Sequence, residues 1–459
     1  MSIRDIPLSP TPKDNLPPMT DRAEETVGHR KMLAIALPVM LSNLSVPLLG
    51  LVDTAAVGQL PDAYHIGAVA IGALIFDFIF WGFGFLRMGT SGFAAQAEGR
   101  GDDQELRDTL GRALVIAAAG SLLLLLFQPL IAAGSFYLID GSKNVEQHAR
   151  TYFDIRIWSA PAALANYAFY GFLIGIGRAR AVLVFVLLLN GTNIILDAFF
   201  VLVLGMGADG VALGTLIAEY TGATAAAILI LKELKNRTGV WIWSGIIEAG
   251  AFRRMMNVNT DILIRSLCLT FAFAWFTWQS AAAGDLVLAA NAVLINLFIV
   301  ASYLLDGFSF AAETHVGQAV GSGSRARFWQ AVRMSGLWAG GISVCATLIA
   351  FALGPYIIDL LTVNPEVRII ARQYLWWAAL TPVAGFACFL LDGIFVGATQ
   401  TRDMRNMMLI TLPLYLLAWW LLVPAFGNDG RWASIIALLL LRALTLGARL
   451  PALARQAFD

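Results

Sequence analysis

Charge is scarce in this chain. Asp, Glu, Lys and Arg make up only 14% of its 459 residues, whereas a typical soluble domain contains about 25%. This shortage excludes a soluble globular protein, and it also excludes a disordered chain, which combines high charge with few apolar residues. The 31 acidic residues balance the 31 basic ones, so there is no net positive field that would hold a nucleic acid.

Histidine and cysteine are also few and scattered. The three cysteines, Cys268, Cys345 and Cys388, lie inside apolar runs and form no recognisable disulfide framework. The chain lacks a glycine-rich phosphate-binding loop of the Walker type, which argues against an ATP-driven pump. We therefore predict a protein that is not an enzyme and that needs no cofactor and no metal site built from histidine and cysteine. The four histidines stand far apart, at His29, His65, His148 and His315.

Long apolar runs are what the chain has in abundance. Hydrophobic residues make up 58% of it, and a helix that crosses a membrane needs about 20 of them. Residues 1–30 are polar and rich in proline, without the apolar core of a signal peptide. We predict an all-α membrane protein with twelve transmembrane helices. The apolar runs cover approximately residues 33–57, 66–90, 109–133, 151–176, 181–204, 210–231, 257–280, 286–312, 331–353, 370–398, 406–426 and 432–450.

The charges of the connections predict how the chain lies in the membrane. If the N-terminus is cytoplasmic, twenty lysines and arginines lie near helix ends on that side. Cytoplasmic loops carry the excess of positive charge in membrane proteins. We therefore expect a multi-pass protein of the inner (plasma) membrane with both termini in the cytoplasm. The opposite side has only five such residues, Lys143, Arg150, Arg368, Arg372 and Arg431.

The two halves of the chain resemble each other. The segment 96–101 (QAEGRG) recurs as 318–323 (QAVGSG), an offset of 222 residues. This offset spans six predicted helices, so both halves would have the same membrane orientation, as in transporters with parallel repeats. We predict two pseudo-symmetric six-helix bundles and alternating access between them. The predicted parts are a tail (1–30), an N-lobe (31–231), a cytoplasmic linker (232–256) and a C-lobe (257–459).

Polar residues of three predicted helices share one depth in the N-lobe. Counted along the helices at 1.5 Å per residue, Asp53, Asp197 and Thr215 lie about 8–12 Å below the outer surface, and Asn193 lies one turn below Asp197. Two carboxylates, an amide and a hydroxyl can share protons or bind a hard cation such as Na⁺. Structural roles stay open, because Asp53 could reach the surface and the others could simply join helices. The equivalent C-lobe residues are not acidic: Trp275, Tyr415, Trp419 and Ile435.

Other charges lie inside the predicted spans, where an ionised group is costly and usually functional or paired. Asp77 has no obvious partner and is a candidate for a role in transport. Asp261 and Arg265 stand four residues apart, so we expect them to neutralise each other. Asp306 and Glu313 share one face of the eighth span, and we expect Glu313 to reach water at the cytoplasmic end.

Four segments resemble the multidrug and toxic compound extrusion (MATE) family, closest to its DinF-like branch. They are Pro38 and Asn43 followed by 47–58 (PLLGLVDTAAVG), Gln96-Ala97 with Gly99 and Gly101, 193–197 (NIILD), and 210–215 (GVALGT). The resemblance covers about residues 30–450. It implies two six-helix lobes in a V shape that export organic cations and other amphipathic compounds in exchange for H⁺ or Na⁺.

The resemblance also implies a set of site residues. In this branch the cation site matches Asp53, Asn193, Asp197 and Thr215, with Tyr152 nearby. Pro38 matches the proline at which the first helix bends, and proline does remove a backbone hydrogen bond. The NorM-like branch uses acidic residues of the C-lobe instead, and Asp261 and Asp392 do not clearly align with those.

We therefore expect a monomeric antiporter, surrounded by membrane lipid, that acts on small amphipathic, cationic molecules. One alternative is a lipid-linked saccharide flippase of the same superfamily, which would line its central cleft with basic groups. Only Arg87 and Arg265 are candidates for such groups. The other alternative is a membrane receptor or scaffold that transports nothing.

Overall fold

The computed structural model describes residues 26–60, 64–138 and 142–459, apart from the side chains of 46–49, 51–54, 56 and 138. Helices account for all of the regular secondary structure in these ranges. Nine of the described helical stretches are long and apolar enough to cross a membrane. The predicted all-α membrane fold is confirmed.

The first half of the chain is built from nine α-helices. Three of its predicted spans are broken into pieces: α3 and α4 follow each other closely, α6 follows α5 after a single residue, and the 3₁₀ turn Ile157–Ser159 joins α7 to α8. The helices are α2 (His29–Val57), α3 (Tyr64–Gly82), α4 (Phe85–Arg100), α5 (Asp103–Leu126), α6 (Gln128–Leu138), α7 (Lys143–Arg156), α8 (Ala160–Gly175), α9 (Ala179–Ala198) and α10 (Ala208–Lys235).

The second half has longer helices. The helix labelled α16 contains two membrane spans, because the chain reverses at Gly427, where φ is 58°. A hydrogen bond of 3.2 Å between the Thr411 and Thr445 hydroxyls holds its two arms side by side. The helices are α12 (Ala249–Ala281), α13 (Asp285–Gly321), α14 (Arg325–Leu361), α15 (Pro365–Gly397), α16 (Thr401–Gly447) and α17 (Leu450–Phe458), preceded by the short α11 (Trp243–Ile246).

Several helices run beyond the apolar runs that predicted them. The eighth run ends at about residue 312, whereas α13 continues to Gly321, and the fourth run begins at about 151, whereas α7 begins at Lys143. Hydropathy marks only the part of a helix that lies in hydrocarbon. The backbone hydrogen bonds of a helix continue into the polar segments on either side.

The repeated segment has the same local structure in both halves. Gly101 and Gly323 end their helices with φ values of 68° and 67°, a left-handed conformation that glycine adopts without strain. The next residue then caps the following helix, since Asp102 accepts a hydrogen bond from the Glu105 amide and Ser324 accepts one from the Arg327 amide. The repeat is therefore a helix end, a tight turn and a helix start.

The way the helices pack is repeated as well. A Cβ atom at Gly171 would overlap the carbonyl oxygen of Arg87, and one at Gly393 would overlap that of Ser309. These two pairs are related by the offset of 222 residues. The close approach of α4 to α8 in the first half therefore recurs as α13 to α15 in the second, which is the packing expected of a duplicated bundle.

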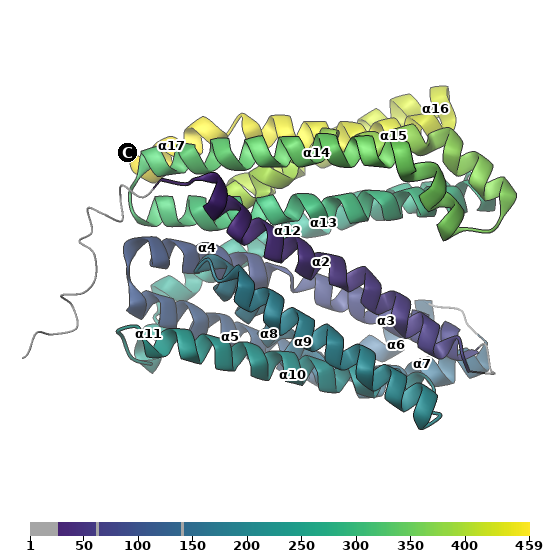
Figure 1. The fold of residues 1–459 in the computed structure, drawn as a ribbon, viewed down its shortest axis with the longest axis horizontal. Helices are drawn as coiled ribbons and strands as arrows, with labels where there is room; N and C mark the ends of the chain where they lie inside the picture. Colours follow the sequence, from purple (N-terminus) through teal and green to yellow (C-terminus); the bar gives the residue numbers. More distant parts are fainter. Residues whose placement is uncertain (1–25, 61–63, 139–141) are drawn as a thin grey trace, which may run out of the picture.

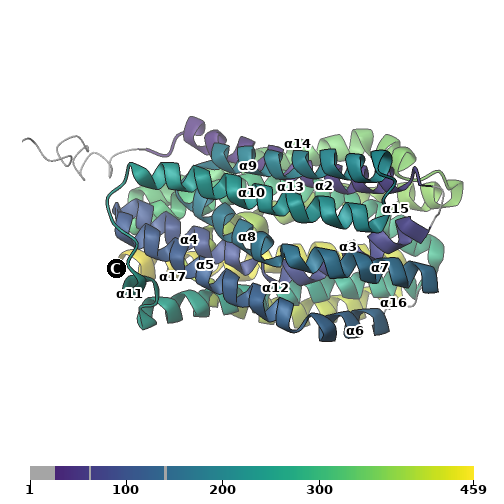
Figure 2. The same ribbon diagram turned by 90° about the horizontal axis from the view of Figure 1, so that it is seen from below.

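Three apolar clusters hold the helices together. One is formed by the first half together with Met255 of α12 and surrounds Phe76 and Phe153, and one lies within the second half, around Phe276 and Trp432. The third joins both halves and includes residues of α2, α4, α8, α13 and α15. In Figure 1 most helices of the second half lie in the upper part of the view and most helices of the first half lie in the lower part. In Figures 1 and 2 the start of α2, the helix α11 and the C-terminus lie at the same end of the molecule. We call this end the terminal end.

The segment between the halves is tied to the first half. Arg237 forms ion pairs with Glu98 at 2.5 Å and Glu233 at 3.0 Å; burial alone would lower the pKa of Arg237, but these partners raise it above its usual value. Glu248 caps α12, and the backbone amides of Ala251 and Gly250 hold the pKa of the Glu248 carboxyl below its usual value. The segment is thus an ordered connection.

The orientation in the membrane can be tested at two exposed serines. In a variant without native cysteines, Ser244→Cys in α11 and Ser142→Cys before α7 would each supply one accessible thiol, since both serines are exposed. A membrane-impermeant maleimide added to intact cells should label position 142 and spare position 244, because the positive charges predict that the terminal end is cytoplasmic. Labelling of position 244, or protection of position 142, would reverse the predicted orientation.

Candidate functional site

Three of the four residues predicted to bind the coupling ion meet between α9 and α10. The Asn193 amide donates both of its hydrogens, to Asp197 Oδ2 at 3.0 Å and to the Thr215 hydroxyl at 3.2 Å. The Thr215 hydroxyl in turn donates to the Val211 carbonyl oxygen at 2.9 Å. Asp197 is 0% and Asn193 1% exposed. The Asp197 carboxylate is therefore buried in the interior of the first half, with the Asn193 amide bonded to it.

Glycine gives this carboxylate its space. A Cβ atom at Gly214 would overlap Asp197 Oδ1, so the sequence Gly214-Thr215 supplies both room and a hydroxyl on one turn of α10. The Asn193 Oδ1 atom is buried and accepts no hydrogen bond within the described residues. Such an unused acceptor can bind a hydrogen-bond donor or a cation that enters the site.

The first helix passes along this group. The side chain of Asp53 lies outside the described residues, although its backbone belongs to α2, so its place in the site stays a prediction. Nearby, Asn190 donates to the Ser45 hydroxyl at 2.6 Å and thereby joins α9 to α2. Asn190 was missed in the sequence, although it stands one turn before Asn193 on the same helix face.

Pro38 lies inside α2, and the helix continues through it to Val57. Its carbonyl oxygen accepts a hydrogen bond of 2.8 Å from the Ser42 hydroxyl, and the Ser42 carbonyl oxygen accepts one of 2.6 Å from Ser45. A series of short polar contacts thus runs along α2 from Pro38 to the Ser45–Asn190 bond. The predicted bending of the helix at Pro38 remains a prediction.

Tyr152 lies in α7, packed against α3. It is buried, and its ring occupies the space that a side chain at Gly72 would need. Its hydroxyl accepts a hydrogen bond from the Arg156 guanidinium one turn along the helix. Asp77 is exposed on α3 and interacts with Arg156 electrostatically, without contact. The sequence singled out Tyr152 and Asp77 but missed Arg156, which lies between them.

At the terminal end, the two halves meet along a surface that we call the seam, formed by α4 and α13. A Cβ atom at Gly99 would overlap the Gln318 carbonyl oxygen, and one at Gly321 would overlap that of Gln96. The two copies of the repeated segment therefore cross each other directly. The Gln96 amide also donates to the Gly397 carbonyl oxygen at 3.1 Å.

The seam holds a buried ion pair. Glu313 accepts a hydrogen bond from Ser91, and its second oxygen lies 3.7 Å from Arg87 Nη1. The Arg87 guanidinium also stacks on Phe310, 4.1 Å from the ring centre. The expectation that Glu313 reaches water is wrong, since it is only 1% exposed. Position along a helix predicted its depth, but its burial comes from a helix of the other half.

The second half also pairs its charges. Asp261 lies 2.5 Å from Arg405, and Asp392 is shared by Arg265 and Arg442, the latter at 2.6 Å. The expected pairing of Asp261 with Arg265 is therefore wrong. Although the two residues stand one turn apart, each finds a better placed partner on another helix.

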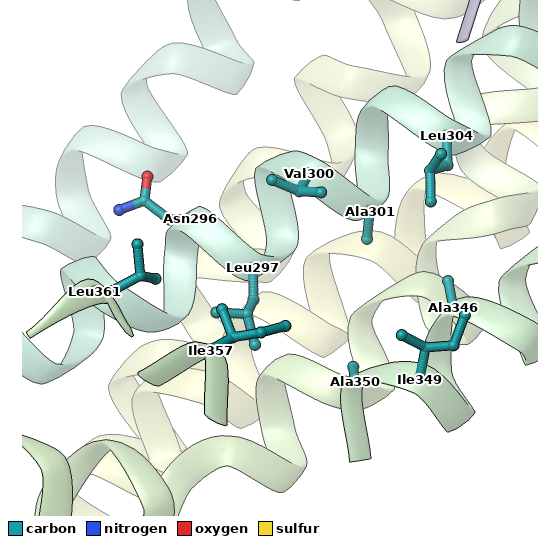
Figure 3. Close-up of a pocket in the computed structure, with 10 residues that line it drawn as sticks. All are labelled: Asn296, Leu297, Val300, Ala301, Leu304, Ala346, Ile349, Ala350, Ile357 and Leu361. Carbon is teal, nitrogen blue, oxygen red and sulfur yellow. The ribbon is translucent and has the colours of Figure 1, made fainter. Parts of the chain in front are cut away.

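An apolar pocket lies between α13 and α14. Figure 3 shows its lining, which is aliphatic except for Asn296 and includes Val300 and Ile349. No ionisable group lines it, so it offers no chemistry for binding a coupling ion.

Comparison with known proteins identifies the family. A family model described as MatE matches residues 38–199 and 262–421 of this chain, once in each half. The chain belongs to this MATE family. Its members are transporters rather than enzymes, so the chain is a multi-pass membrane transporter that uses no cofactor.

Individual relatives agree with this assignment. The chain is 38% identical to the DNA damage-inducible protein F of Escherichia coli (strain K12) over 92% of each chain. It is 25% identical to the probable multidrug resistance protein NorM of Pasteurella multocida (strain Pm70), over 92% of this chain and 94% of that one.

Two solved structures have the same fold. The first, described as MATE in the bent conformation, has a TM-score of 0.85 at 18% identity and covers 96% of this chain and 100% of its own. The second is described as the outward-facing conformation of a MATE family transporter. It has a TM-score of 0.84 at 18% identity and covers 94% of this chain and 100% of its own.

The close approach at Gly214 can be tested by adding one methyl group. Gly214→Ala should push the Asp197 carboxylate out of place and lower the free energy of unfolding by about 1–3 kcal/mol, measured as a fall in the apparent Tm of the purified protein. Gly191→Ala is the matched control, because α9 has open space there, and alanine should leave the Tm unchanged or raise it. Equal shifts in both variants would mean that the carboxylate does not need this space.

Proposed function

We propose that this transporter is a secondary antiporter of the inner membrane that exports amphipathic, cationic drugs or toxic compounds in exchange for H⁺ or Na⁺. The observation that carries the proposal is the Asn193–Asp197–Thr215 group, buried between two membrane-spanning helices. The name of the NorM relative supports the class of substrate. We treat the protein as a monomer that binds its small-molecule substrates from the membrane or the cytoplasm.

The chemistry of the buried group suits coupling. A carboxylate in the interior of a membrane protein is costly when charged and gains by taking up a proton or a hard cation. The Asn193 amide that bonds to it, and the Thr215 hydroxyl that bonds to the same amide, are neutral and can rearrange without adding charge. If Asp53 completes the group, the two like charges would repel until a cation binds, and binding would draw α2 toward α9 and α10. Ion binding would then favour one conformation over another.

The seam supports alternating access by rocking of the two halves. At the terminal end, the halves touch through backbone atoms at Gly99 and Gly321 and through the Arg87–Glu313 ion pair. Such contacts close this end. An opening toward the cytoplasm would have to break them, so the seam would be the gate on that side.

The flippase alternative fits less well. Such a protein needs basic groups free to bind a diphosphate, yet Arg87 contacts Glu313 and Arg265 contacts Asp392. Both of the basic groups considered for that role are neutralised within the protein. The receptor or scaffold is excluded by membership of a transporter family.

Neutralising Asp197 tests the coupling site. In proteoliposomes, Asp197→Asn should abolish export of a fluorescent cation such as ethidium driven by an imposed pH or Na⁺ gradient, because the amide can take up neither ion. Asp154→Asn changes an exposed aspartate of α7 and should export normally. The gradient that drives the wild type identifies the ion. Export by Asp197→Asn at the wild-type rate would place the coupling site elsewhere.

Reversing charges tests the seam. Arg87→Glu places two carboxylates together and should shift the equilibrium toward the open seam by about 1–3 kcal/mol, which is about fivefold to a hundredfold in population. A thiol introduced by Gln318→Cys should then react faster with a soluble maleimide. The double variant Arg87→Glu/Glu313→Arg restores opposite charges and should slow the reaction again. If none of these changes alters the labelling rate, the ion pair does not hold the seam closed.

A further inference from the structure

Arg156 of α7 lies within the fourth predicted apolar run, close to the candidate coupling site. It is half-buried at the end of α7, bonded to the Tyr152 hydroxyl, with its guanidinium 5.3 Å from the centre of the Phe76 ring. Within the described ranges no carboxylate forms an ion pair with it, and its buried Nε finds no hydrogen-bond acceptor. By contrast, Arg87, Arg265, Arg405 and Arg442 each contact an acid.

Two acids flank Arg156 without touching it. Asp77 lies on α3 and Glu219 on α10, and both interact with Arg156 through their charge. Glu219 is held away from the guanidinium by Asn166 of α8, whose amide donates to Glu219 Oε2 at 2.8 Å and to the Glu219 carbonyl oxygen at 3.1 Å. Three helices thus bring two carboxyl groups and one guanidinium into the same region without direct contact between them.

Charges held apart in this way are expensive inside a membrane unless they bind something. A guanidinium with unused N–H groups binds a carboxylate through two parallel hydrogen bonds, and this pairing is stronger than a neutral hydrogen bond. The flanking carboxylates suit an ammonium or iminium group. A small molecule that carries both kinds of charge would match the arrangement.

We propose that Arg156, together with Asp77 and Glu219, forms a subsite for amphoteric substrates, with Arg156 binding the carboxylate of the substrate and the two acids binding its cationic end. The proposal rests on the proposed export function and narrows its substrate class. Arg156 is here a residue that determines specificity, and it takes no part in ion coupling.

The subsite adjoins the candidate coupling site without sharing its residues. Glu219 lies one turn beyond Thr215 on α10, about 6 Å along the helix, and Arg156 lies one turn beyond Tyr152 on α7. A bound substrate would therefore place its charges next to the Asn193–Asp197–Thr215 group. Ion binding there could then weaken the hold on the substrate through space.

Two dyes that differ in one group test the proposal. Rhodamine 6G is a permanent cation whose acid is masked as an ethyl ester, and rhodamine 19 is the same dye with a free carboxylate. Binding of both to the purified full-length protein is measured by fluorescence anisotropy, and export of both is measured in proteoliposomes. The binding measurement tests the subsite even if the chosen ion gradient drives no export.

The wild type should bind rhodamine 19 at least as tightly as rhodamine 6G. Arg156→Gln should raise the Kd for rhodamine 19 tenfold or more and change the Kd for rhodamine 6G less than twofold, because only the acid contacts the guanidinium. Arg156→Lys keeps the positive charge but cannot form two parallel hydrogen bonds to a carboxylate, so its Kd for rhodamine 19 should lie between those of the wild type and Arg156→Gln. Arg150→Gln is the matched control on the same helix, since Arg150 is exposed and paired with Glu146, and it should change neither Kd.

The proposal is overturned if Arg156→Gln weakens the binding of both dyes equally, because that would indicate a structural role for Arg156. It is also overturned if the wild type fails to bind rhodamine 19. Failure of the wild type to export either dye, with binding of rhodamine 19 intact and dependent on Arg156, would count against the antiporter function and leave the subsite supported.

Discussion

The cost of a charge inside a membrane governs the arrangement of this protein. An ionised side chain at that depth persists only where it is paired, reaches water or acts on a ligand. Most of the intramembrane charges have found a protein partner: Arg87 with Glu313, Asp261 with Arg405, and Asp392 with two arginines. Asp197 is fully buried and accepts a hydrogen bond from Asn193, and Arg156 contacts a hydroxyl and aromatic rings. These two positions are the ones for which we propose a role in ion coupling and in substrate binding.

The two halves share the packing of their helices but differ in the side chains of the candidate coupling site. Backbone contacts at glycine recur in both halves, as at Gly171 and Gly393. The side chains of the coupling group do not recur: the positions equivalent to Asn193 and Asp197 hold Tyr415 and Trp419. Tyr415 is buried, and its hydroxyl donates to the Ala272 carbonyl oxygen at 3.2 Å. The second half thus fills with aromatic rings the space in which the first half keeps its carboxylate.

Much of this could be predicted from the sequence, because the relevant signals are local. Hydropathy indicated the spans, and helix periodicity together with depth brought Asn193, Asp197 and Thr215 to one place. The failures share one cause. Asp261, Arg265 and Glu313 found partners on helices distant in sequence, and neither spacing nor depth reports which helix faces which. Arg156 and Glu219 were missed for a related reason. Each lies in an apolar run, and the sequence does not show that their helices bring them close together.

The meeting of Ser91 and Glu313 has a consequence for how such a fold could arise. The two residues occupy equivalent positions of the repeat, so each faces its own counterpart across the pseudo-twofold axis. In a symmetric dimer of identical halves, a glutamate at this position would face a second glutamate at hydrogen-bond distance, and the two would repel. The contact therefore requires that the two copies differ, with serine at one position and an acid at the other. A single chain that contains both copies meets this requirement, so it can hold an asymmetric contact on the axis itself.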